Sequence, residues 1–147
     1  MSMRPAEQTP VRVTVKTAIY SGSDRNTFEW TTFGRYYKKA NSSYLQYDEV
    51  TEEGDVHTTV KMTGNEVLIL RSGAIKMRLP FLLNKKTPGN YKTAYGLIET
   101  SALTKRLSLD FSEDKQEGQV DLLYEMSIQG ASAGTYHLTI NYREESK

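Results

Sequence analysis

Alternation of apolar and polar residues with a period of two runs through most of this 147-residue chain and is the feature that most limits its fold. It is densest in Val56–Leu83, where three strand-like runs are separated by Thr63–Asn65 and by Ser72-Gly73. Such alternation is typical of strands with one buried face, and short polar turns between them predict antiparallel neighbours. No run of twelve residues keeps helical apolar spacing without also fitting alternation. The chain is therefore predicted to be all-β.

Nine or ten short strands are expected in a single domain at residues 11–143, between an N-terminal lead-in at residues 1–10 and a polar tail at residues 144–147. So many strands in so short a chain must stack as two sheets or close into a barrel. Closure removes unpaired strand edges, and short hairpins suit an up-and-down order. The pattern favours a single antiparallel up-and-down β-barrel of about 8–10 strands, with a two-sheet sandwich as the alternative.

The composition argues against several classes of protein. The formal net charge is +1, which disfavours a nucleic acid as the main partner. The chain has no cysteine, so it can form neither a disulfide nor a thiolate metal site, and a cytoplasmic location is favoured. No apolar segment is long enough to span a membrane, and Met1–Pro10 lacks the apolar centre of a signal peptide. No membrane association is therefore expected.

The Ser72-Gly73 turn decides which way Arg71 points. In a two-residue hairpin, Arg71 would face Ala74 and point to solvent. If Gly73 instead sits in a bulge, the register slips by one residue and Arg71 points inward with Met77 and Phe81. Both orientations remain open from the sequence.

Apolarity does not resolve this choice, because both faces of Val67–Leu70 are apolar. An inward guanidinium would need a carboxylate partner. Glu49 and Glu99 are the candidates, and Glu49 shares its strand face with Tyr47, which favours an inward position. The orientation of Arg71 thus bears directly on whether the interior holds an ion pair.

The segment from residue 84 to residue 100 is interpreted as a loop followed by one strand. Pro88-Gly89 marks a loop at Asn84–Asn90. In the strand expected at Tyr91–Thr100, Tyr91, Thr93 and Tyr95 share one face, either as a pocket wall with hydroxyls or as core.

Motifs for common chemistries are absent from the sequence. There is no phosphate-binding glycine loop, dinucleotide fingerprint or G-x-S-x-G motif, so neither a cofactor nor a catalytic residue is assigned. His57 and His137 have no metal-ligand spacing, and no metal site is predicted. Basic and aromatic residues interleave in Arg35–Lys39, which suits either RNA contacts or a strand end with solvent-reaching lysines.

Four segments, Tyr44–Glu49, Thr58–Lys61, Val67–Met77 and Tyr91–Gly96, resemble in sequence, order and spacing the YwiB-like family of small bacterial proteins. The resemblance implies a calycin-like or lipocalin-like β-barrel in the cytoplasm. It implies no established activity, so no catalytic residue is carried over. The positions that match the family pattern are Tyr47, Glu49, Arg71, Gly73, Tyr91 and Gly96.

The sequence is best interpreted as a non-enzymatic barrel that binds a small, partly apolar or anionic ligand in its interior. Arg71 is the expected anion anchor and Glu49 the residue that orients it. The remaining candidate ligand-binding residues are Tyr47, Met77, Phe81, Tyr91, Thr93 and Tyr95. The alternatives are a protein- or RNA-interaction module that uses the outer basic and aromatic face and, third, an enzyme that uses Glu49 with Arg71. The oligomeric state, including a homodimer, stays open.

Overall fold

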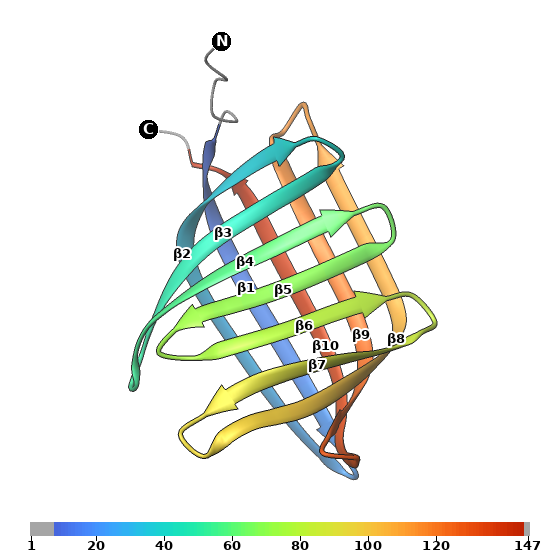
Figure 1. Cartoon of the computed structure of the whole chain (residues 1–147). Helices are drawn as coiled ribbons and strands as arrows, with labels where there is room; N and C mark the ends of the chain where they lie inside the picture. The colour runs from blue at the N-terminus through green and yellow to red at the C-terminus, as the bar shows by residue number, and fades with distance from the viewer. Residues whose placement is uncertain (1–7, 146–147) are drawn as a thin grey trace.

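The computed structural model describes residues 8–145, and within them every regular element is a β-strand (Figure 1). Residues 1–7 of the expected lead-in and residues 146–147 of the expected tail lie outside the described residues. The strands are β1 (Thr9–Ser21), β2 (Asp24–Lys39), β3 (Ser42–Thr51), β4 (Gly54–Thr63), β5 (Glu66–Gly73), β6 (Lys76–Leu82), β7 (Lys86–Thr93), β8 (Gly96–Ser112), β9 (Glu117–Ile128) and β10 (Ala131–Glu144).

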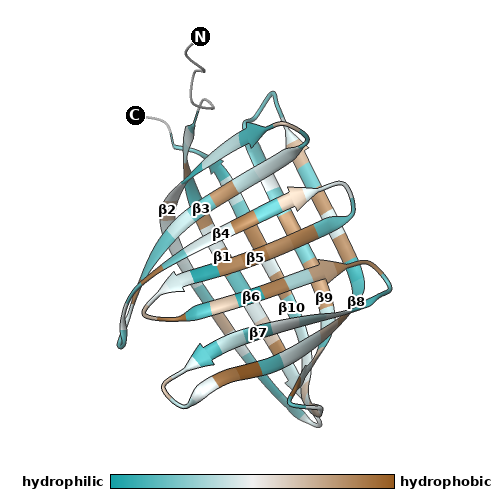
Figure 2. Ribbon diagram, in the orientation of Figure 1, coloured by the Kyte–Doolittle hydropathy of each residue, from teal (hydrophilic) through white to brown (hydrophobic). Residues whose placement is uncertain are grey.

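The strands form one closed barrel, in which each strand pairs antiparallel with its sequence neighbour and β1 pairs with β10. The predicted all-β, up-and-down barrel is confirmed, and the sandwich alternative is wrong. Figure 2 shows apolar and polar residues alternating along β4, as one buried face requires, whereas β5 is apolar over Val67–Leu70. The described residues contain no helix of the length and apolarity that crossing a membrane would take.

The barrel has two ends of different character. One end, which we call the closed end, carries both chain termini and the β2–β3, β4–β5, β6–β7 and β8–β9 turns (Figure 1). We call the other end the mouth. Side chains fill the closed end: Tyr36 stacks on both Phe111 and Tyr142, with ring centroids 5.0 and 5.2 Å away. Phe81 and Leu45 are fully buried nearby. The core is therefore densest away from the mouth.

The structure corrects the expected loop at Asn84–Asn90. Most of that segment belongs to β7, and Thr87 and Gly89 are buried. A Cβ on Gly89 would lie within 3.3 Å of Leu79, so the glycine permits a close approach of β7 to β6. Pro88 is accommodated because β6 and β7 share a main-chain ladder only at Lys76–Arg78, away from the proline.

Candidate functional site

A cavity of about 310 Å³ lies inside the barrel toward the mouth. All ten strands contribute to its walls, so it exists only because the sheet closes. The lining residues are Val15, Thr17, Trp30, Tyr47, Glu49, Thr58, Ile69, Arg71, Met77, Leu79, Tyr91, Thr100, Tyr124, Met126, Ile128, Tyr136 and Leu138. The volume is at the lower end of the range for small-molecule sites, and apolar walls with a few polar groups are typical of them.

Arg71 points into this cavity. It pairs with Met77 across β5 and β6, so five residues, 72–76, separate the last paired positions of the two strands, and the inward alternative is the observed one. Gly73 adopts φ +97°, and a Cβ there would collide with the Asp55 carbonyl. The amide of Ala74 donates to the same carbonyl at 2.9 Å. The longer turn and the left-handed glycine thus set the register that brings the guanidinium inside.

Glu49 and Arg71 form an ion pair at the mouth side of the cavity, with Nη2 of Arg71 2.6 Å from Oε1 of Glu49. The side chains are 23% and 24% exposed, so water screens the pair only partly. Nη1 of Arg71 also contacts the Met77 sulfur at 3.7 Å. A guanidinium carries five N–H donors, so these two contacts leave donors for a further polar group. Glu99, the other carboxylate considered, is exposed on β8.

Neutral phenols line the cavity beside this pair. Burial raises the pKa of the Tyr47 phenol above its ordinary value; the Arg71 charge lowers it, Glu49 raises it further and the Thr58 hydroxyl lowers it. Burial, followed by the nearby Tyr136, likewise raises the pKa of Tyr124. These groups therefore act at neutral pH as hydrogen-bonding hydroxyls rather than as charges.

The cavity adjoins a groove between the hairpins at the mouth. The groove has a volume of about 670 Å³ and shares Arg71, Met77 and Tyr91 with the cavity. Its outer part is formed by the β5–β6 and β7–β8 turns. Arg71 therefore lies at the boundary between the internal cavity and the groove, and it lines both.

Five of the eight predicted site residues line the cavity: Tyr47, Glu49, Arg71, Met77 and Tyr91. The other three lie elsewhere. Phe81 is 1% exposed and packs on Tyr124, with ring centroids 4.6 Å apart, within the core. Thr93 lines the groove at the mouth.

The predicted position of Tyr95 in the barrel interior is wrong. Tyr95 occupies the β7–β8 turn and its side chain is fully exposed. The expected single strand at Tyr91–Thr100 is broken there, because the Thr93 hydroxyl accepts the Tyr95 amide at 3.1 Å and donates to the Gly96 carbonyl at 3.1 Å. Gly96, at φ +125°, starts the next strand. A side-chain-capped turn thus interrupts alternation that looked continuous.

Several cavity residues were not predicted, chiefly Trp30, Thr58, Thr100, Tyr124 and Tyr136. Their alternation signals an inward face, but an inward residue can equally lie in the filled closed end. The position along the barrel axis depends on how the strands tilt and stagger, which the pattern does not specify.

The basic and aromatic segment Arg35–Lys39 does not present one continuous face. Tyr36 is buried in the core, whereas Tyr37 stacks on Tyr44 with ring centroids 5.0 Å apart. The ammonium of Lys38 lies 3.6 Å from Glu113. Alternation therefore divides the segment between the two sides of the sheet.

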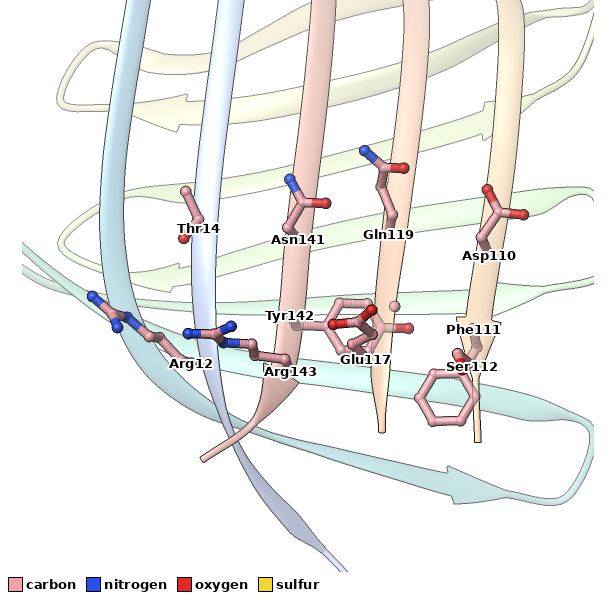
Figure 3. A pocket seen from close by; sticks show the side chains of 11 residues that line it. Arg12, Thr14, Asp110, Phe111, Ser112, Glu117, Gln119, Asn141, Tyr142 and Arg143 are labelled. Carbon is pink, nitrogen blue, oxygen red and sulfur yellow. The ribbon is translucent and has the colours of Figure 1, made fainter. Parts of the chain in front are cut away.

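A second hollow, of about 600 Å³, lies on the outside of β1, β8, β9 and β10 (Figure 3). Arg12 and Arg143 face each other across β1 and β10, and Glu117 lies opposite Arg143 on β9. Asp110 supplies a second carboxylate, so the charges of the hollow balance. We favour the interior cavity as the site because all ten strands contribute walls to it, whereas the hollow lies on one face of the sheet.

No group of three or more His, Asp or Glu side chains suited to a metal ion occurs within residues 8–145. The fold and the site together define a closed ten-stranded β-barrel with a mainly apolar internal cavity and one ion pair near its mouth.

Comparison with known proteins places the chain in a family. The family described as "Domain of unknown function (DUF1934)" matches residues 13–140, and the chain belongs to it. The chain is 35% identical over 136 residues to the "uncharacterized beta-barrel protein YwiB" of Bacillus subtilis strain 168, covering 92% of this chain and 94% of that protein. The crystal structure of the Bacillus subtilis ywiB protein superposes with a TM-score of 0.84 at 33% identity, covering 95% of this chain and 94% of that one. The resemblance to the YwiB-like family is thereby confirmed.

Proposed function

We propose that this protein binds a small, partly apolar molecule inside the barrel, with the polar end of the ligand at the Glu49–Arg71 pair. The observation that carries the proposal is a cavity of about 310 Å³ whose apolar walls meet that ion pair near the opening. A barrel whose interior only has to be packed would require neither an internal cavity nor an internal ion pair. Desolvating such a pair costs free energy. No role as an enzyme is proposed.

The polar end of the ligand is best matched by a group that both accepts and donates hydrogen bonds. Arg71 offers donors, and Glu49 offers an acceptor oxygen within the same pair. A carboxylate ligand would gain from Arg71 but would meet the negative charge of Glu49. A neutral amide or hydroxyl-bearing head meets no such repulsion and is the favoured class, ahead of an anion.

A ligand panel read by thermal shift tests this proposal, with paired compounds that share an apolar body and differ only in an amide or a carboxylate head. The amide members should raise the melting temperature, because a ligand that binds only the folded state stabilises it. Hits should be confirmed by calorimetry. The absence of any hit that raises the melting temperature would argue against the site.

Two neighbouring residues on β5 supply a matched control. Ile69 lines the cavity, whereas Leu70 lies on the outer face and is 38% exposed. Ile69→Phe should reduce the cavity and weaken binding at least about tenfold, equivalent to 1.4 kcal/mol. Leu70→Phe should leave binding unchanged. Equal effects of the two substitutions would place the ligand outside the barrel.

A further inference from the structure

Within residues 8–145, the mouth half of β2 has no neighbouring strand on one side. Asp24–Phe33 pairs with β1 throughout, whereas β2 pairs with β3 only over Gly34–Lys39. Figure 1 shows β3 leaving β2 toward the β3–β4 hairpin. One side-chain bond, from the Thr32 hydroxyl to the Asp48 carbonyl at 2.8 Å, spans the point where they separate. The stretch from residue 24 to residue 31 therefore presents an open strand edge.

Three features that commonly prevent edge-to-edge pairing, namely proline, lysine and a β-bulge, are missing from this edge. Thr27, Phe28 and Trp30 are residues that favour strands. Phe28 is 55% exposed, and Phe33, just beyond the edge, is 63% exposed. An exposed, regular and partly aromatic edge is a template for another strand.

We propose that this edge pairs antiparallel with the same edge of a second copy of the chain, forming a twofold-symmetric dimer. The charges of the edge indicate the register. With Thr27 on the twofold axis, Arg25 lies opposite Glu29 of the second copy, and Glu29 lies opposite the second Arg25. Both residues are on the outer face of the sheet because they alternate with the cavity residue Trp30. Each dimer then contains two oppositely charged cross-strand pairs.

Neighbouring registers do not pair these charges. With Arg25 or Glu29 on the axis, two like charges face each other, which destabilises a cross-strand pair. With Asn26 or Phe28 on the axis, Arg25 faces a threonine. Self-complementary charge at a single register is the argument for a second copy, rather than an unrelated strand, as the occupant. The inference does not depend on the interior ligand.

Charge reversal tests the proposal by sedimentation velocity on the full chain over a wide concentration range. The wild-type chain should form a dimer. Arg25→Glu alone and Glu29→Arg alone should each weaken it by about tenfold or more, because both cross-strand pairs become like-charged. The double variant should restore it. An equimolar mixture of the two single variants should also dimerise, because one chain then carries two carboxylates opposite two guanidinium groups.

Asp114→Arg, in the β8–β9 turn at the closed end, is the matched control, since it changes the charge by the same amount away from the edge and should leave the dimer intact. Circular dichroism should show that each variant keeps its β-structure. The proposal is overturned by a wild-type chain that stays monomeric, by a dimer that resists both single reversals, or by single variants that neither the double variant nor the mixture rescues.

Discussion

Removing one member of the Glu49–Arg71 pair should destabilise the barrel more than removing both. Arg71→Leu leaves a carboxylate facing apolar walls, and Glu49→Leu leaves an unpartnered guanidinium. Breaking a fully buried pair costs about 3–5 kcal/mol. Since each side chain keeps about a quarter of its exposure, we expect about 2 kcal/mol for each single substitution.

The double substitution should cost only about 1 kcal/mol, because a leucine pair needs no desolvation of charge. The interaction free energy from the double-mutant cycle is then about 3 kcal/mol. For a chain of this size, each single substitution should lower the melting temperature by about 4–8 °C. These values follow from the 2.6 Å separation and the partial burial of the pair.

Urea unfolding followed by tryptophan fluorescence is the suitable assay. Trp30 is the single tryptophan, lines the cavity and meets the Tyr47 ring edge-on at 5.6 Å, so its emission reports on the interior. The exposed Lys105–Glu125 pair, at 3.6 Å, is the control, with an expected coupling of about 0–1 kcal/mol. A coupling for Glu49–Arg71 no larger than that of the control would refute the assignment of a partly desolvated pair.

Three further predictions concern the core. In the unfolded chain phenols ionise near pH 10, whereas buried phenols with a raised pKa keep their protons. The unfolding free energy is therefore at its full value below pH 10 and falls above it by about 1.4 kcal/mol per phenol and pH unit. Alkaline unfolding monitored by phenolate absorbance checks this. The phenols concerned are Tyr47, Tyr124 and Tyr142. Thr104→Val should raise the unfolding free energy by about 1 kcal/mol, because the buried Thr104 hydroxyl has no hydrogen-bond partner among the described residues; a loss of stability in urea would contradict this. Gly34→Ala should lower the melting temperature by about 4 °C or more, because its Cβ would collide with the Gln46 carbonyl; an unchanged value would show that β2 and β3 can separate freely.

Regular strands made part of the site predictable. In β3, Leu45, Tyr47 and Glu49 occupy alternate positions without interruption, so the buried Leu45 and Tyr47 fix the inward direction of Glu49. Alternation succeeds here because the side-chain period of a strand is two and β3 contains no bulge in its pairing with β4.

Turns and bulges limited how far the orientation of the other residues could be predicted from the sequence. The direction of Arg71 depended on turn length, which the apolar residues on both faces of β5 could not report. In β8, a register shift between Thr104 and Arg106 reverses the face of the residues that follow. Leu103, before the shift, lies opposite Glu125 and points outward. Leu107, after the shift, lies opposite the buried Leu122. A single inserted residue is enough to break a parity argument.

The two ends of the barrel explain why a cavity persists in so small a domain. At the closed end, stacked rings and branched aliphatic residues fill the interior and belong to the hydrophobic core. Phe81 packs on the wall residue Tyr124, so the packed region begins directly beside the cavity. Because the closed end supplies this packing, the mouth half can keep an unfilled interior and a charged pair, both of which cost stability. Retaining two such costs in one place, beside an opening, is what favours a binding site over a loosely packed core.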